Sequence, residues 1–305
     1  MDEALELRPS WLAKSVWPFE TYSVDTGRVA VAVTEVGSGP PLLFVHAGLW
    51  SFIWRDVMLR LAGEFRCICV DAPSNGLSQK LGHTRTTLEE SARAIAAVIE
   101  RLDLRDFTVV AHDLGGPVAM AGSIRRAQHV RGIVAINTFA WRPSSGPLRA
   151  MLSVMGNPVV RELSALTQFV PKLTATSFGA GRHYSGADVR AFLEGIGARG
   201  THAFHDYMRS ASHSDRIYEC AQRALSVYLS HLPVLTIFGE RNDPFGFQRH
   251  WKALFPNATQ IVVPRGNHFP MCDEPDLVAS SLRSWYRESV TTRNRMLSPA
   301  HDSML

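Results

Sequence analysis

The sequence predicts an α/β fold in which a mostly parallel, doubly wound sheet carries an inserted helical cap. Apolar, strand-like runs alternate with helical stretches from residue 41 to residue 137, the order expected of parallel strands with helices on both faces. From residue 139 to residue 231 the periodicity is helical and is broken by prolines and glycines. Strand-like runs return at residues 233–239 and 260–264, so the helical stretch is an insertion between two strands of one sheet.

Local signals define the individual elements. Residues 22–37 alternate in polarity around a glycine-containing turn, which is typical of a β-hairpin. Thr86 or Thr87 caps a helix that carries Glu89 and Glu90 in its first turn. The other expected elements are strands over 41–46, 66–70 and 130–137 and helices over 54–62, 87–102 and 277–288. The chain is accordingly divided into a first core part (1–138), a helical cap (139–231), a second core part (232–290) and a flexible tail (291–305).

Composition indicates one large globular α/β protein. The chain has 305 residues, of which 46% are hydrophobic and 20% charged, and these values are ordinary for a globular enzyme. The net charge is +4, but the basic residues are scattered rather than clustered. Nucleic acid is therefore not an expected partner. No apolar run reaches the length of a membrane span, so no membrane partner is expected either. The expected partner is a small-molecule substrate, and the oligomeric state is left open.

The cysteines and the N-terminus suggest a reducing compartment. The cysteines are Cys67, Cys69, Cys220 and Cys272, and their spacing matches no metal-binding motif. We expect buried free thiols, no metal and no cofactor. The stretch 1–6 is acidic and lacks the apolar region of a signal peptide. The sequence therefore predicts a cytoplasmic protein.

The segment 107–120 contains the most informative motif. A β-branched apolar run ends at Asp113, two glycines follow at 115 and 116, and a helical stretch begins there. This is the layout of a nucleophile elbow, a sharp strand-to-helix turn that exposes one side chain above a sheet. A carboxylate needs no base before it attacks a saturated carbon, so a histidine is left free to activate water. The alternative is that Asp113 only caps the helix, but the glycine pair favours the catalytic interpretation.

Three further motifs follow predicted strands, where an open α/β sheet builds its site. Asp243 follows one buried strand, His268 follows the last strand, and His46 ends an earlier one. The order nucleophile, acid, histidine suggests that His268 activates water while Asp243 fixes its tautomer. Asp243 could instead cap the next helix, and His46 could only brace its loop.

An oxyanion hole is expected beside these groups. The loop after His46 should supply one backbone N–H, from Gly48 or Leu49, and Leu114 should supply the other.

These motifs together resemble the α/β-hydrolase superfamily from about Tyr22 to Glu288. Within it, residues 110–117 are similar to the D-W-G-G-P elbow of the branch that uses an aspartate nucleophile. That branch holds haloalkane dehalogenases, fluoroacetate dehalogenases and epoxide hydrolases. Residues 130–141 resemble the N-T-x-x-W stretch that leads into a dehalogenase cap, and Trp54-Arg55 resembles the W-R pair after the oxyanion loop.

The chain departs from this pattern at the leaving-group site. Dehalogenases usually place a tryptophan after the nucleophile to hold the halide, and this chain has Leu114. The oxyanion loop lacks the usual asparagine and proline, and no arginine follows Asp113 as it does in fluoroacetate dehalogenases. Trp50 and Trp141 are candidate replacement donors.

The resemblance leaves three functions open. The first is a haloalkane dehalogenase-like hydrolase that forms an alkyl ester on Asp113 and acts on a small apolar substrate. The second is an epoxide hydrolase, for which the cap offers tyrosine donors. The third is a non-catalytic binding protein with a hydrolase fold. The expected leaving-group pocket consists of His46, Trp50, Trp141, Tyr184 and Tyr207, and the other cap tyrosines are Tyr218 and Tyr228.

Overall fold

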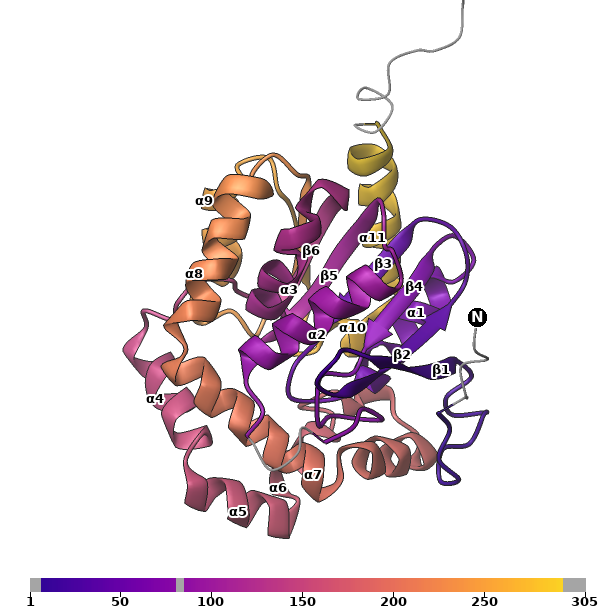
Figure 1. Cartoon of the computed structure of the whole chain (residues 1–305), viewed down its shortest axis with the longest axis vertical. Coiled ribbons are helices and arrows are strands. Elements are labelled where there is room, and N and C mark those ends of the chain that lie inside the picture. Colours follow the sequence, from indigo (N-terminus) through magenta and orange to yellow (C-terminus); the bar gives the residue numbers. More distant parts are fainter. Residues whose placement is uncertain (1–6, 81–84, 293–305) are drawn as a thin grey trace, which may run out of the picture.

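An eight-stranded sheet forms the centre of the computed structural model, which describes residues 7–80 and 85–292 (Figure 1). The strand order is β1-β2-β4-β3-β5-β6-β7-β8, and only the β1–β2 and β2–β4 pairs are antiparallel. The strands are β1 (Glu20–Asp25), β2 (Ala30–Val36), β3 (Pro41–Val45), β4 (Arg66–Val70), β5 (Phe107–Asp113), β6 (Val130–Thr138), β7 (Val234–Gly239) and β8 (Thr259–Val263). The predicted fold class, a mostly parallel sheet with helices, is confirmed.

The register of the sheet brings the predicted motifs to one edge. Val45 at the end of β3 pairs with Ala111 of β5, and Asp113 at the end of β5 pairs with Thr138 of β6. Gly239 ends β7 opposite Val263 of β8. Because parallel strands point the same way, the loops that follow β3, β5, β6, β7 and β8 all emerge at this edge.

Helices cover both faces of the sheet. They are α1 (Arg55–Leu61), α2 (Leu88–Arg101), α3 (Gly115–Ser123), α4 (Gly146–Met155), α5 (Pro158–Thr167), α6 (Phe169–Thr174), α7 (Gly186–His213), α8 (Asp215–Arg223), α9 (Phe247–Leu254), α10 (Pro270–Asp273) and α11 (Pro275–Trp285). Val109 and Val110 of β5 belong to two different hydrophobic clusters, one on each face, as the two-residue alternation of a strand requires. The β5 strand is therefore buried from both sides.

Helix α2 shows how closely the local signals match the structure. Thr87 caps it by accepting a hydrogen bond from the backbone N–H of Glu90, and Glu89 and Glu90 lie in its first turn. Acidic side chains are favourable there because the helix dipole is positive at its N-terminus.

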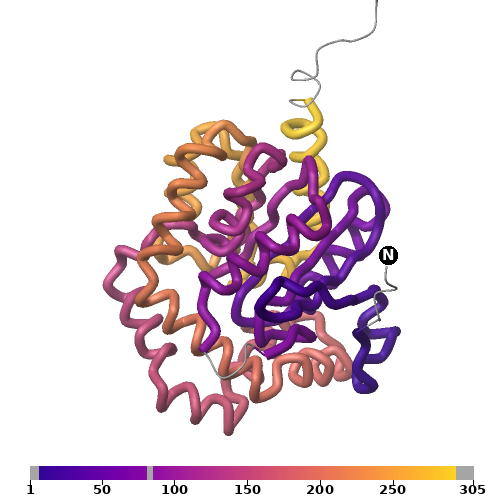
Figure 2. Tube along the Cα trace, in the orientation of Figure 1, coloured from indigo at the N-terminus to yellow at the C-terminus, as the bar shows by residue number. Residues whose placement is uncertain are grey.

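The stretch between β6 and β7 is helical, and none of its described residues joins the sheet. Helices α4, α5 and α6 each pack on the long helix α7 (Figure 1). Helix α8 instead packs on α3, a helix of the core. Figure 2 traces this stretch, in pink to orange, along the left and lower sides of the molecule. We use the name cap for α4 to α7, and the boundaries at residues 138 and 231 stay a prediction.

The first half of α7 is fixed to the core. Asp188 forms an ion pair with Arg55 of α1, and the indole N–H of Trp50 donates to the carbonyl of Phe192 at 3.2 Å. Gly195 lies against the same indole, where an added Cβ would come within 2.4 Å of the ring. Near Gly197 the helix is kinked, with φ at +52°.

Two predictions lie wholly or mostly outside the described residues. The N-terminal stretch 1–6 and residues 293–305 of the predicted tail are not described. Within the described part of the chain, no helix combines the length and the apolar character needed to cross a bilayer.

Candidate active site

Asp113 occupies the strained turn that the sequence predicts. It is the last residue of β5, before α3, and has φ at +49°, a left-handed conformation that is uncommon for residues other than glycine. The two glycines that follow are required by close packing. A Cβ at Gly115 would lie 2.3 Å from the carbonyl oxygen of Val45, and one at Gly116 would lie 2.2 Å from Thr138 Oγ1. Backbone strain of this kind is concentrated at functional sites.

His268 faces Asp113 from the loop after β8. Its Nε2 lies 3.9 Å from Asp113 Oδ2, which is too long for a direct hydrogen bond. Burial acts to raise the pKa of Asp113, but the imidazole of His268 and the amide of Leu114 bring that pKa below its ordinary value. The carboxylate is therefore ionised near neutral pH and is available as a nucleophile.

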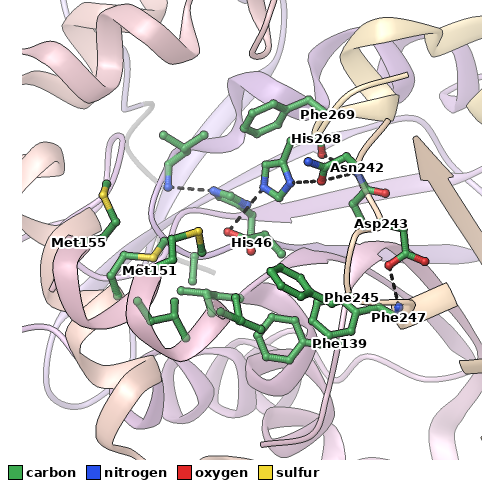
Figure 3. A pocket seen from close by; sticks show the side chains of 18 of the residues that line it. His46, Phe139, Met151, Met155, Asn242, Asp243, Phe245, Phe247, His268 and Phe269 are labelled. Atoms are coloured by element: carbon green, nitrogen blue, oxygen red, sulfur yellow. Dashed lines mark hydrogen bonds and ion pairs between the residues drawn. The ribbon is translucent and has the colours of Figure 1, made fainter. Parts of the chain in front are cut away.

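The acid partner predicted for His268 is wrong. Nδ1 of His268 donates to Oδ1 of Asn242 at 2.9 Å, and Figure 3 shows the Asn242 amide turned toward the imidazole. Asp243 points away from His268 and accepts the N–H groups of Phe247 at 2.6 Å and Gln248 at 3.0 Å. Its carboxylate thus caps the N-terminus of α9, the alternative that the sequence left open.

The replacement of a carboxylate by an amide changes what the pair can do. The Asn242 oxygen still holds the proton on Nδ1 of His268, so the lone pair on Nε2 faces Asp113. An amide has no negative charge, however, and it stabilises an imidazolium less than an aspartate would. The sequence prediction selected Asp243 because it is charged. The residue directly before it, Asn242, makes the contact with His268 instead.

Two further histidines, His46 and His112, lie buried beneath His268. Nε2 of His46 accepts the backbone N–H of Leu49 at 2.8 Å, so its proton is on Nδ1. That proton points at Nδ1 of His112, 3.3 Å away. His112 then carries its own proton on Nε2, which donates to the carbonyl of His268 at 2.8 Å. This chain fixes both tautomers and holds the backbone of His268 in place.

Both members of this pair are neutral in the fold. Burial lowers the pKa of His46 to about 3. Burial likewise lowers the pKa of His112 well below its ordinary value. The interpretation that His46 braces its loop accounts for its hydrogen bonds. His112 directly precedes the nucleophile, but no spacing in the sequence indicated its role.

Acidification below about pH 6.5 is expected to destabilise the fold through this pair. The unfolded chain binds protons at both histidines there, whereas the folded chain does not, so the stabilisation present above pH 6.5 is lost as the pH falls. Each histidine contributes about 1.4 kcal/mol per pH unit. Urea unfolding at pH 7, 6 and 5 measures this loss. In His112→Asn the pH dependence should be shallower by one proton, and an unchanged slope would contradict the assignment.

Asn137, near the end of β6, connects the loops that follow β7 and β8. Its Nδ2 donates to the carbonyl of Asn267 at 2.9 Å and to Oδ1 of Asn242 at 3.2 Å. Its own Oδ1 accepts the N–H of Gly239 at 3.0 Å. The residue takes a left-handed conformation with φ at +37°, which asparagine tolerates better than most side chains. Asn137 is the asparagine of the N-T-x-x-W stretch found in the sequence, which assigned it no role.

The predicted oxyanion donors are partly corrected. The N–H of Leu49 is occupied by His46, so it does not point into the site. The amide of Leu114 contributes to lowering the pKa of the Asp113 carboxylate, as expected of a donor that would also serve an ester formed on that carboxylate. Gly48 and Leu114 stay as the predicted pair.

An apolar cavity of about 490 Å³ opens above Asp113 and His268. Its walls are mainly phenylalanine, methionine and leucine, with Met151 and Met155 of α4 on one side and Phe245 and Phe247 on another (Figure 3). None of the described tryptophans or tyrosines lines it. Such a cavity fits an apolar small molecule and offers few hydrogen-bond donors to a leaving group.

The prediction that Trp50 or Trp141 donates to the leaving group is wrong, because neither side chain lines the cavity. The Trp50 indole donates to Phe192 in the anchor of α7. Trp141 lies against His250, with ring centroids 4.0 Å apart, and against Trp251. Both indoles pack in hydrophobic clusters rather than in the cavity wall.

The predicted tyrosine donors are also displaced from the cavity. Tyr184 contacts Cys272, and the Tyr207 hydroxyl donates to the carbonyl of Pro73 at 2.8 Å. The Tyr218 hydroxyl donates to the carbonyl of Ala211 at 3.0 Å, and Tyr228 does not line the cavity. Of the predicted pocket residues, only His46 lines the cavity.

The described residues contain no group of three or more His, Cys, Asp or Glu side chains arranged to hold a metal ion. The cysteines are free; Cys67, Cys69 and Cys272 are buried, while Cys220 is partly exposed.

Comparison with known proteins agrees with the fold. The model of the alpha/beta hydrolase family matches residues 42–281. Haloalkane dehalogenase 2 of Mycobacterium tuberculosis is 27% identical over 274 residues, which cover 88% of this chain and 95% of that protein. The cis-3-alkyl-4-alkyloxetan-2-one decarboxylase of Shewanella oneidensis is 23% identical over 290 residues, with 90% of each chain covered. The solved structure of a haloalkane dehalogenase from Bradyrhizobium elkani superimposes with a TM-score of 0.73 at 19% identity, covering 88% of this chain and 98% of that one.

The chain therefore belongs to the alpha/beta hydrolase family. Within this family, it is similar to haloalkane dehalogenases over most of its length.

Proposed function

We propose that the protein cleaves a carbon–halogen bond in an apolar substrate through an alkyl ester on Asp113. The observation that carries this proposal is the ionised carboxylate at the floor of an apolar cavity, 3.9 Å from a histidine that is held as a base. In the first step an oxygen of Asp113 attacks the saturated carbon, and the halide leaves with the bonding electrons. This step requires no proton transfer.

In the second step, water cleaves the ester at its carbonyl carbon. Nε2 of His268 is the base that accepts a proton from the water, and the amide of Leu114 faces the oxygen on which negative charge develops. The amide partner Asn242 makes His268 a weaker base than an aspartate would. We therefore propose that ester cleavage is the slow step.

Departure of the leaving group is the other weak point. A halide that forms in a dry cavity needs hydrogen-bond donors, and losing one such donor costs roughly 3 kcal/mol in the barrier. Bromides and iodides should therefore react better than chlorides. An epoxide has less support, because the alkoxide that forms on ring opening needs a proton and the cap tyrosines lie outside the cavity wall.

Halide release from matched 1-chloro-, 1-bromo- and 1-iodoalkanes, with an epoxide of the same length in parallel, tests this function. Bromide and iodide release, with little chloride release, would support it. Epoxide opening without halide release would transfer the assignment to an epoxide hydrolase. A preparation that binds the alkanes but turns over none of these substrates would favour a binding protein.

Replacing the amide partner with a carboxylate is expected to accelerate the slow step. In Asn242→Asp the new carboxylate would accept hydrogen bonds from Nδ1 of His268 and Nδ2 of Asn137, and would stabilise the imidazolium. Ester cleavage should speed up by at least about tenfold. The single-turnover decay of the alkyl ester measures this rate. The control Asn242→Ala leaves the Nδ1 proton unheld and should slow the decay, and a slower decay in Asn242→Asp would contradict the proposal.

A strained lactone is a second candidate substrate, favoured by the small number of hydrogen-bond donors in the cavity. The Shewanella relative is named as a decarboxylase of oxetan-2-ones with two alkyl arms. Asp113 would attack the saturated ring carbon that is bonded to the ring oxygen, and the bond between these two atoms would break. The leaving group would be a carboxylate, which is stable without donors. Loss of CO₂ would then form an alkene while the ester bond to Asp113 breaks and regenerates its carboxylate.

The lactone reaction uses no water and no base, so it would not depend on His268. A synthetic cis-dialkyl oxetan-2-one separates the two candidates. Alkene and CO₂ formation that persists in His268→Gln would favour the lactone, and a hydroxy acid as the product would exclude it.

A further inference from the structure

The cap carries an apolar outer surface that its packing does not explain. Helix α5 buries its small residues Ser164 and Ala165 and turns its large apolar residues outward. Leu166 is 83% exposed and Phe169 of α6 is 62% exposed. We define the cap surface as six exposed apolar side chains of α4, α5 and α6 beyond the mouth of the cavity, namely Val154, Val159, Leu163, Leu166, Phe169 and Leu173. An amphipathic helix normally has the reverse orientation.

This surface is continuous with the cavity above Asp113. Met151 of α4 lines the cavity and is also 48% exposed, so the cavity reaches the exterior beside the cap surface. Figure 1 shows α4, α5 and α6 on the outer side of α7. A molecule that moves along these helices therefore reaches the cavity over apolar side chains.

The charge around the surface favours an anionic partner. From residue 146 to residue 178 the basic residues are Arg149, Arg161 and Lys172, and Glu162 is the sole acidic residue. Arg161 forms ion pairs with Glu162 and with Asp206 of α7. Arg149 and Lys172 are exposed beside the apolar side chains. Apolar side chains with flanking cations are the pattern of a surface that lies on an anionic lipid bilayer.

We propose that the cap surface binds the headgroup region of an anionic lipid bilayer, with the cavity opening at the membrane. The protein would lie on the bilayer rather than cross it. A second copy of the chain is less well supported. It would cover Met151 at the opening of the cavity and would bring like charges together across a twofold axis. The sequence led us to expect no membrane partner because no segment is long enough to span a bilayer. Binding at the bilayer surface requires no such segment.

Sedimentation of the full chain with lipid vesicles tests the proposal. Vesicles that contain phosphatidylglycerol should retain the protein, and vesicles of phosphatidylcholine alone should retain it less. The double variant Leu166→Gln/Phe169→Gln should bind at least about tenfold more weakly, because each substitution removes most of the apolar area that one side chain inserts. Lys172→Gln should weaken binding to the anionic vesicles alone, by about fivefold.

The matched control is Leu59→Gln/Val227→Gln, which changes two exposed apolar residues outside the cap surface. This control should bind as the unchanged protein does. No binding to anionic vesicles, or an equal loss in the control, would overturn the proposal. A dimer in sedimentation equilibrium that Leu166→Gln/Phe169→Gln dissociates would assign the surface to a second copy instead. Halide release from a water-soluble bromoalkane should be unchanged in every variant, which separates this test from that of the proposed function.

Discussion

Asp113→Ala is expected to lose at least about 10⁴-fold of the turnover, because no other group replaces a missing nucleophile. Halide release under substrate saturation measures the effect. The matched control is Asp243→Ala, which removes the carboxylate next to the site. Because that carboxylate caps α9, the control should keep its activity within a few-fold and lose about 1 kcal/mol of stability.

The pair of variants also decides between the two acids considered for the site. If Asp243→Ala were as inactive as Asp113→Ala while remaining folded, Asp243 would have a catalytic role that its hydrogen bonds do not indicate. Full activity of Asp113→Ala would contradict the assignment of Asp113 as the nucleophile.

His268→Gln is expected to stop the reaction after the first step. Asp113 should still attack, since the carboxylate is ionised without help from a base, but the ester should persist because no group activates water. Mass spectrometry of the intact protein after incubation with a bromoalkane should show one added alkyl group. Digestion should locate that group on the peptide that contains Asp113.

The unchanged protein and Asp113→Ala provide the controls for this experiment. The first should show little adduct at the end of the reaction, and the second should show none. An alkyl group on a serine, or complete turnover by His268→Gln, would contradict the covalent mechanism.

The fold could be predicted from the sequence because its signals are local and redundant. The strands of the sheet centre are continuous apolar runs, such as the one that ends at Val45, and they alternate with helices whose caps are visible, such as Thr87. The glycines at 115 and 116 belong to a turn that tolerates no larger side chain. Each of these features depends on a few neighbouring residues, so a single sequence reveals them.

The site was less accessible because its contacts join loops that are far apart in the chain. Asn242 and Asp243 differ by one position, and only the path of the loop after β7 turns the first toward His268 and the second toward α9. The tautomers of His46 and His112 depend on a backbone N–H and a carbonyl, which leave no mark on residue identity. Side-chain direction in loops follows from tertiary packing rather than from local pattern.

The aromatic residues show the same limit. Trp50 and Tyr184 are chemically suited to donate a hydrogen bond to a leaving group, but nothing in the sequence says which side of a helix or loop they occupy. Both are used to pack the cap onto the core. An aromatic residue with a polar group is more often a packing residue with one satisfied hydrogen bond than a ligand of a substrate.

The contact between Gly195 and Trp50 restricts how this protein can diverge. Any side chain at position 195 would collide with the indole, so the first half of α7 and the loop after β3 can change only together. Helices α4, α5 and α6 have no such requirement, since they pack on α7 and on one another. Descendants of this chain can therefore acquire new substrates by mutation in α4, which supplies Met151 and Met155 to the cavity wall, while the anchor of the cap and the histidine network beneath it are inherited unchanged.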